Sequence, residues 1–519
     1  MASRFYHFAT SSESSYNHDT DDVEKGQNDS TSNLVPPAAS AAIPMDMMPP
    51  APKPIFSSYN TSFVSDSSTL AVSEPKIQPP KVNPPAEKKK KNVSKAILFR
   101  LWFNAYRRLF TFIIILNLVG LFFVAAGKFH YARHNLGAMV LGNLLFAILM
   151  RNELFFRLLY MVAIYGLRSW APIRMKLWVA SFLQHAGGVH SACAVSGAGW
   201  LVYYIAVTID HRDTYPASII ASAVVTSCLI IVSIISALPW VRNNHHNIFE
   251  KYHRFAGWLG LIATWIFVML GKCYDLTRGE WRTDARTIFN SQEVWFTVFM
   301  TVFIAAPWVT IRHVPVEVEI PSPKVAVLRF NRGMQQGLLG RISRTSVMEF
   351  HAFGIISEGR KSPYHYMVCG VQGDFTKGLV ANPPTKIWTR ELKFAGIGHA
   401  SAMFKRGIRI CTGTGIGAAL STCIQSKDWF LIWIGSNQKE TFGPTISRLI
   451  HDNIEPDRMI LWDSKERGGR PDTVQLLKDT WRNFGAEVIF ITSNMTGNDE
   501  MMQGCREAGM HAFGTLWDF

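Results

Sequence analysis

The chain has 519 residues, of which 48% are hydrophobic and only 18% charged, and it contains 16 Trp and 34 Phe. This composition favours a membrane protein that carries a soluble part over a wholly soluble enzyme. The net charge of +15 includes the run Lys88–Lys91 and arginines beside apolar segments, a distribution typical of a chain at an anionic membrane face. We therefore expect no nucleic-acid partner.

The first 95 residues predict a disordered tail. Residues 1–95 are rich in Ser, Pro, Asn and Thr and poor in aliphatic side chains, so they bury too little apolar surface to offset the entropy lost on ordering. The seven cysteines show no metal-ligand spacing. Four of them lie in the part that we expect in the cytosol, so they should be free thiols: Cys369, Cys411, Cys423 and Cys505.

Residues 96–312 predict an all-α membrane domain of six helices, because six apolar segments are long enough, or nearly so, to cross about 30 Å of hydrocarbon. An arginine-bearing stretch between the second and third segments is typical of an interfacial segment. Lys and Arg are more frequent at one set of helix ends, which predicts cytosolic N- and C-termini in an integral membrane protein of the plasma membrane, with the lipid bilayer as a partner. The six segments are Leu109–Gly127, Leu136–Met150, about Trp178 to Ile209, Ala217–Val241, Phe255–Gly271 and Val294–Ile311.

The residue pattern changes after the last apolar segment. Residues 313–406 contain short β-rich runs between Pro, Gly and charged turns, which predicts a small antiparallel β-barrel. Residues 407–519 alternate apolar strands with helices, which predicts an α/β domain with a parallel sheet covered on both faces. Ligands of such sheets bind at the carboxyl ends of the strands.

A glycine cluster lies at such a strand end, in "RICTGTGIGAALS" at residues 409–421. Gly413, Gly415 and Gly417 would let the backbone approach a pyrophosphate, and the next helix would offer its first amides to that anion. A tight turn without a ligand is the alternative. A second strand end carries "DSKERGGR", where Ser464, Lys465, Arg467 and Arg470 suit a 2′-phosphate or, alternatively, form a solvated basic loop.

From about residue 136 to the end, these motifs resemble the ferric reductase and NADPH oxidase superfamily, with a six-helix membrane domain, a ferredoxin-reductase-like FAD-binding barrel and an NADP-binding domain. Within it, the likeness is strongest to fungal TmpA-like transmembrane flavoproteins, a family implicated in signalling for asexual sporulation. The loop resembles the NADP loop of ferredoxin reductases, which implies a nucleotide-binding role for Thr412, Gly413, Thr414, Gly415, Ile416, Gly417 and Ser421.

The same resemblance implies a flavin site. "FHAFGIISEG" resembles the family's His-Pro-Phe-Thr motif and would place His351, Phe353 and Ser357 beside FAD, with Ala352 and Gly354 replacing the usual Pro and Thr. The chain ends in "TLWDF", so Trp517 or Phe519 would stack on the flavin, or the segment would only pack the final strand.

Two departures from the family are plain. Heme-bearing relatives carry two histidines on each of two helices, whereas His185, His190 and His253 have no second histidine at that spacing. One heme between His185 or His190 and His253 stays open, against histidines that only pack the helices. The last nucleotide strand also ends in Thr492, Ser493 and Asn494 where relatives place Cys-Gly-Pro.

The resemblance implies an integral membrane flavoprotein oxidoreductase that takes electrons from NADPH onto FAD, has a signalling or developmental role and passes electrons to an unknown acceptor. The alternatives are a catalytically weak NADPH and flavin redox sensor or a single-heme ferric-reductase-like protein. A transporter is disfavoured because few charges interrupt the helices.

Overall fold

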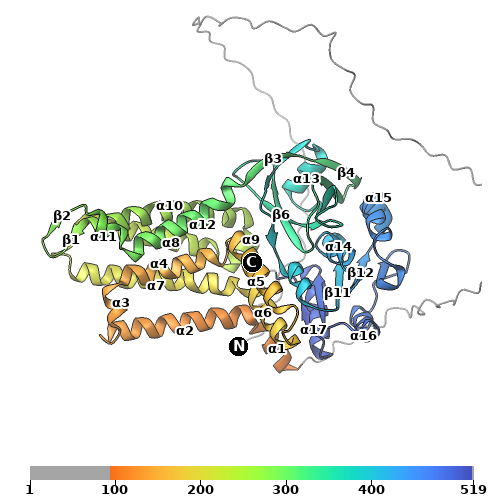
Figure 1. Ribbon diagram of the computed structural model, residues 1–519, viewed down its shortest axis with the longest axis horizontal. Helices are drawn as coiled ribbons and strands as arrows, with labels where there is room; N and C mark the ends of the chain where they lie inside the picture. The colour runs from red at the N-terminus through yellow and green to blue at the C-terminus, as the bar shows by residue number, and fades with distance from the viewer. Residues whose placement is uncertain (1–93, 517–519) are drawn as a thin grey trace, which may run out of the picture. The chain divides into compact units, whose positions relative to one another are not determined.

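The computed structural model describes residues 94–516 (Figure 1). The predicted disordered tail of residues 1–95 lies almost entirely outside the described residues, and so do Trp517 and Phe519.

The first part of the described chain is helical. Six of its helices, α2, α4, α7, α8, α10 and α12, lie side by side in Figure 1 and enclose a core that includes the fully buried Trp200. The helices are α1 (Lys95–Trp102), α2 (Ala105–Ala125), α3 (His130–His134), α4 (Leu136–Leu149), α5 (Glu153–Leu167), α6 (Ile173–His185), α7 (Gly187–Asp210), α8 (Ala217–Ser236), α9 (Pro239–Asn244), α10 (His246–Cys273), α11 (Ala285–Phe289) and α12 (Gln292–Val309), with a small hairpin of β1 (Tyr274–Asp275) and β2 (Glu280–Trp281) after α10.

Among the described residues, five helices are long and apolar enough to cross a membrane, by length and composition alone. A sixth span exists only if α4 and α5, which meet at 72°, count as one broken span. The bend has a local cause at Asn152, whose side chain accepts the backbone N–H of Leu154 and Phe155 and donates to the carbonyl of Phe303. An amide in this position caps α5 and ends α4. The prediction of six spans therefore stays unconfirmed.

The predicted third span is also divided. The segment from Trp178 to Ile209 forms α6 and α7, which are separated at Ala186. Gly188, in the first turn of α7, lies against the backbone of Tyr106 so closely that no side chain would fit there. Glycine at the start of α7 thus allows the backbones of α2 and α7 to touch.

The middle of the chain forms a curled antiparallel sheet, as the β-rich runs predict. Its strand order is β3-β9-β6-β7-β8-β5-β4, with β10 paired to β6. Alternate residues face the interior, although β5 is buried on both faces along most of its length. The strands are β3 (Ile311–Pro315), β4 (Glu317–Ser322), β5 (Val325–Asn331), β6 (Leu338–Ser343), β7 (His351–Ile356), β8 (Tyr364–Gly370), β9 (Lys386–Arg390) and β10 (Phe394–Ala395), with helix α13 (Asp374–Ala381) after β8 and the 3-10 helix η2 (Ile397–Met403) after β10.

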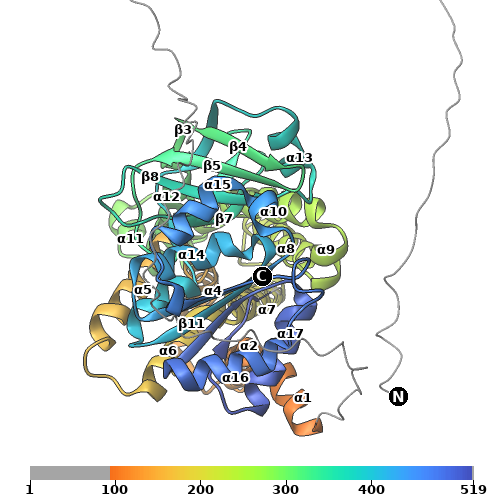
Figure 2. The ribbon, with the colours of Figure 1, turned by 90° about the vertical axis from the view of Figure 1, so that its right-hand side faces the viewer.

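The last part is an α/β domain with a five-stranded parallel sheet in the order β13-β12-β11-β14-β15. Two separate cores cover its faces (Figure 2): α14 and α15 pack on the face toward the curled sheet, and α16 and α17 pack on the other. The predicted fold of this part is confirmed. The strands are β11 (Gly407–Thr412), β12 (Trp429–Gly435), β13 (Met459–Asp463), β14 (Val488–Thr492) and β15 (Ala512–Phe513); the helices are α14 (Ile416–Gln425), α15 (Gln438–His451), α16 (Thr473–Phe484) and α17 (Met495–Glu507).

Candidate functional site

The glycine loop lies at the carboxyl end of β11, the central strand of the parallel sheet. Residues Gly413–Gly415 form one 3-10 turn, and α14 begins directly after it at Ile416. Gly413 has a φ of 51°, a conformation that side chains disfavour. A Cβ at Gly415 would lie 2.6 Å from the carbonyl oxygen of Thr492, so only glycine lets the loop approach the end of β14.

The other loop residues are divided between the surface and the interior. Thr412 is partly exposed, and its hydroxyl meets that of Ser493 at 2.9 Å, across the end of the sheet. Thr414 is partly exposed and faces Gly370 of β8. Ile416 and Gly417 are buried, and the buried Ser421 donates its hydroxyl to the carbonyl of Ser357. The structure thus brings Thr412 to Gly415 together at the edge and places Ser421 away from it.

The basic loop is organised by Asp463, a residue that sequence reasoning did not single out. Its carboxylate accepts backbone N–H groups of Asn437, Gln438, Lys465 and Glu466 at 2.7–3.4 Å, which joins the loops after β12 and β13. Desolvation alone would raise the pKa of Asp463, but these hydrogen bonds, with that from Gln438 foremost, hold the pKa below its usual value.

The basic side chains of this loop are exposed. Lys465, Arg467 and Arg470 are open to solvent, and Ser464 is half-buried. The guanidinium of Arg467 lies 4.6 Å from the ring centre of Trp462. Because β11 and β13 belong to one parallel sheet, the basic loop and the glycine loop lie at the same edge.

The residues predicted to contact FAD do not form one surface. The Ser357 hydroxyl is fully buried and is used within the protein, because it accepts the N–H of Met334 and donates to the carbonyl of Gly359. His351 and Phe353 are partly exposed on β7, and both stack with Phe375 of α13, at 4.2 and 6.3 Å between ring centres. His351 and Phe353 thus form an aromatic row, and Ser357 lies apart from it.

Of the three candidate heme histidines, two face each other. The ring centres of His190 on α7 and His253 on α10 are 6.3 Å apart, and each Nδ1 meets a backbone carbonyl, those of Ala147 and Ser233. His185 ends α6 and bonds instead to the carbonyl of Ser181 in its own helix. Within residues 94–516, no group of three or more His, Cys, Asp or Glu is placed to hold a metal ion. The heme assignment stays a prediction.

A cavity of about 400 Å³ lies where the helical part, the curled sheet and the α/β domain meet. Its lining includes the turn between α4 and α5, strands β6 and β10, and Thr492 at the end of β14. Gln184 of α6 closes one side, because its amide donates to the carbonyl of Gly514 at 2.7 Å. Cavities of 300–1,000 Å³ are typical of small-molecule sites. The cavity is therefore a second candidate site beside the glycine loop.

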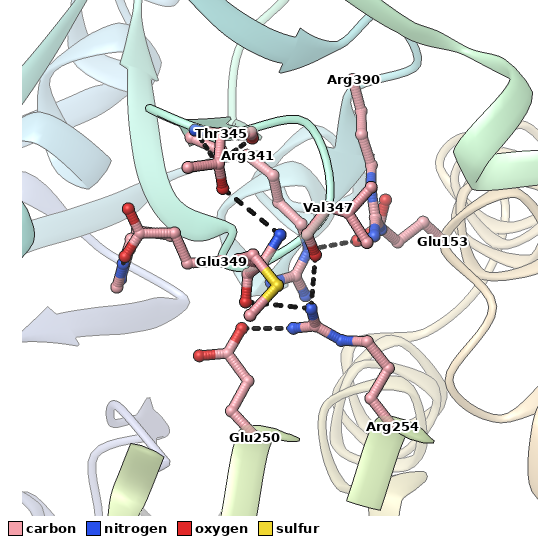
Figure 3. Close-up of polar contacts among 11 residues, drawn as sticks. Glu153, Glu250, Arg254, Arg341, Thr345, Val347, Glu349 and Arg390 are labelled. Atoms are coloured by element: carbon pink, nitrogen blue, oxygen red, sulfur yellow. Dashed lines mark hydrogen bonds and ion pairs between the residues drawn. The ribbon is translucent and has the colours of Figure 1, made fainter. Parts of the chain in front are cut away.

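Charged contacts join the helical part to the curled sheet near this cavity (Figure 3). Glu153, the first residue of α5, accepts hydrogen bonds from Arg341 of β6 and Arg390 of β9. Arg254 of α10 pairs with Glu250 and donates to the carbonyl of Val347 at 2.7 Å. Sequence reasoning missed this network because its partners are far apart along the chain.

Comparison with known proteins finds relatives different from those that the motifs suggest. Residues 397–519 match a model described as "Adenylate-forming reductase 03009, C-terminal domain". Adenylate-forming reductase 06235 of Coprinopsis cinerea is 30% identical over 423 residues, which are 80% of this chain and 40% of that relative. Adenylate-forming reductase 03009 of the same fungus is 29% identical over the same shares. The chain thus spans about 40% of the length of the curated relatives it matches.

Solved structures resemble the chain in fold only. Flavohemoglobin from Malassezia yamatoensis has a TM-score of 0.34 at 12% identity and covers 74% of this chain and 99% of its own. The ferredoxin reductase in carbazole 1,9a-dioxygenase has a TM-score of 0.32 at 13% identity and covers 39% of this chain and 69% of its own. The curated relatives are thus fungal adenylate-forming reductases.

These comparisons correct the functional prediction. The interpretation as a membrane flavoprotein that moves electrons from NADPH to FAD, with a developmental signalling role, was wrong, because the relatives are named adenylate-forming reductases. Its alternatives, a redox sensor and a single-heme ferric-reductase-like protein, are set aside for the same reason. The descriptions membrane, ferric reductase-like and asexual development have no support among the relatives, whereas oxidoreductase is consistent with them.

Proposed function

We propose that this chain is the reductase part of an enzyme of carboxylic-acid-reductase type. The observation that carries the proposal is the glycine loop at the carboxyl end of β11, the central strand of the parallel sheet. A Cβ at Gly415 would lie 2.6 Å from the carbonyl oxygen of Thr492. The name of the relatives, adenylate-forming reductases, supplies the reaction class. Activation of the acid would depend on the parts of the relatives that lie outside the 40% of their length that this chain matches.

The residues at the sheet edge fit a nicotinamide dinucleotide. The backbone of Thr412–Gly415 would lie along the pyrophosphate, and the first amides of α14, which lack partners within the helix, would face it. Lys465, Arg467 and Arg470 at the same edge would favour NADPH over NADH. When bound, NADPH would supply a hydride.

The reaction balances without a further reductant. The acyl carbon of an acyl adenylate gains one hydride, its bond to the phosphate oxygen breaks, and the products are an aldehyde, AMP and NADP⁺. This chain would hold both reactants at the carboxyl end of the sheet, and holding them together removes much of the entropic cost of the step. It would also exclude water from the reacting groups.

The test is NADPH oxidation by the purified chain with a synthetic aryl acyl adenylate. We expect aldehyde and NADP⁺ in equal amounts, and we expect Gly415→Ala to abolish both, because its Cβ would displace the loop from β14. The control is Gly166→Ala on α5, since a Cβ there has no neighbour within 4 Å. NADPH oxidation without aldehyde, or an unchanged rate in Gly415→Ala, would refute the proposal.

Nucleotide selectivity gives a separate prediction. Arg467→Ala and Arg470→Ala should weaken NADPH binding about tenfold or more and leave NADH binding nearly unchanged, because only NADPH carries the 2′-phosphate. Titration of each variant with both nucleotides measures the effect. Equal loss for both nucleotides would mean that the loop supports the fold and does not contact the phosphate.

We propose FAD as a second bound cofactor, with the aromatic row of His351 and Phe353 as the chain's contribution. The support is their partial exposure on β7, next to β8 and the glycine loop. The proposal does not use Ser357, because its hydroxyl donates to a carbonyl within the protein. If the purified protein shows flavin absorbance and the Phe353→Ala variant does not, the assignment is supported. If the unaltered protein shows no flavin absorbance, FAD binding is excluded.

For the location of the chain we propose insertion in a lipid bilayer, with the plasma membrane as the expected site and both termini on the cytosolic side. The five or six long apolar helices support it. They expose large apolar side chains such as Phe112, Phe122 and Val225, as lipid-facing helices do. Release of the protein from cell membranes by alkaline carbonate would contradict this proposal.

A further inference from the structure

Arg409 is a charged residue in the middle of a buried strand. Along β11, Ile408 and Ile410 face the core formed with α16 and α17, so Arg409 faces the opposite side, toward α14 and the curled sheet. Only 2% of Arg409 is exposed. Arginine is rarely buried this deeply unless a counter-charge accompanies it.

The guanidinium of Arg409 is incompletely satisfied. One terminal nitrogen, Nη2, donates to the carbonyl of Ala418, and the group lies 5.7 Å from the ring centre of Phe490. Its Nε has no hydrogen-bond partner among residues 94–516, and none of the acidic residues described there forms an ion pair with it. Burial lowers the pKa of Arg409, because desolvation disfavours its charged form. A buried cation without a counter-charge costs several kcal/mol.

Charged side chains near Arg409 line the same cavity. Arg409 lines the cavity, and so does Arg341, whereas Glu153 is the one carboxylate among the lining residues in the part of the chain that the structure describes. The carboxylate of Glu153 is already bonded to Arg341 and Arg390. Among residues 94–516, the lining therefore has no carboxylate left for Arg409.

The remaining lining combines aromatic and apolar side chains with a few polar residues such as Gln184 and Thr492. Phe156 and Tyr160 of α5 line one side, and Phe394 of β10 lines another. The walls thus suit a ligand with a flat apolar body and one anionic end. The cavity reaches Thr492, which lies against Gly415 of the glycine loop.

We propose that this cavity binds a small aromatic oxyanion, with its carboxylate or phosphate against Arg409 and its ring among Phe156, Tyr160 and Phe394. The anion supplies the missing counter-charge to the guanidinium of Arg409. Binding in this cavity requires no dinucleotide and no hydride transfer, so the proposal stands apart from the proposed reaction.

The test measures thermal unfolding of the full chain in detergent, without any nucleotide. The probes are benzoate, phenyl phosphate and the uncharged benzyl alcohol. We expect benzoate or phenyl phosphate to raise the unfolding midpoint at saturation, since a ligand stabilises the state that it binds, and benzyl alcohol to have no such effect. Stabilisation by benzoate alone assigns a carboxylic acid, and stabilisation by phenyl phosphate alone assigns a phosphoryl ligand.

Variants of Arg409 identify the residue responsible. Arg409→Met should weaken anion binding at least tenfold, as measured by the anion concentration that stabilises the protein. The unliganded variant should be as stable as the unaltered chain or more stable, because an uncompensated buried charge is removed. Arg409→Lys, which keeps the charge and loses Nε, should retain a weaker effect, and it serves if the Met variant fails to fold. Arg329→Met, in an exposed pair with Glu317, is the control and should respond to the probes as the unaltered chain does.

Three outcomes would overturn the proposal. The first is equal stabilisation by benzyl alcohol, and the second is no stabilisation by either anion. The third is an anion effect that survives in Arg409→Met.

Discussion

Glu153→Gln should lower the free energy of unfolding by about 3 kcal/mol. The carboxylate of Glu153 is 11% exposed and bonds to both Arg341 and Arg390, of which Arg390 is 12% exposed. Loss of the charge leaves two arginines crowded at the junction of α5 and the curled sheet. Removal of one member of a buried ion pair costs more than the pair is worth, because the remaining charge stays desolvated.

The matched control is Glu317→Gln. Glu317 pairs with Arg329 on the curled sheet, but their side chains are 68% and 38% exposed. An exposed pair of this kind contributes about 0–1 kcal/mol. Denaturant unfolding compares the two variants, and hydrogen exchange in α5 and β9 locates the loss. A similar small loss in both variants would show that the network at Glu153 does not hold the two parts together.

The sequence patterns were informative where each element carries its own signal. "GIRICT", apolar except for Arg409 and the terminal Thr412, and the apolar run in "DWFLIWIG" lie between turn residues, and they form the adjacent buried strands β11 and β12. Short runs between turns likewise predicted the curled antiparallel sheet. Patterns of this kind reflect local burial, so they can be recognised without a knowledge of what lies across the sheet.

The sites were harder to predict because they depend on residues far apart in the chain. Glu153 and Arg390 are 237 positions apart. Asn152 bends the helix pair α4 and α5 through a bond to the carbonyl of Phe303, a contact that apolar periodicity does not record. Arg409 did leave a signal, as the one charge in an otherwise apolar strand, and that signal was overlooked. The hydroxyl of Ser357, which the family motif places beside FAD, is enclosed within the fold, and its role stays a prediction.

Gly354 shows what a motif comparison alone cannot explain. The resembling family has Thr where this chain has Gly354, and the structure gives a physical reason for the difference. β7 and α14 touch through their backbones at this point: a Cβ on Gly354 would lie 2.5 Å from the Cα of Ala418 and 2.6 Å from the carbonyl oxygen of Gly417. No real Cβ tolerates such distances, and backbone atoms cannot rotate away.

Gly354→Ala should therefore cost about 3 kcal/mol of stability, at the upper end of the usual cost of overpacking, and Gly354→Thr should cost more. Because α14 begins at the glycine loop, the same variants should also weaken nucleotide binding, whereas Gly166→Ala should change neither property. Unfolding curves and NADPH titration of the three variants check this. If Gly354→Thr were as stable as the unaltered chain, the contact between β7 and α14 would have to be looser than its backbone distances indicate, and the glycine loop could then move independently of the curled sheet.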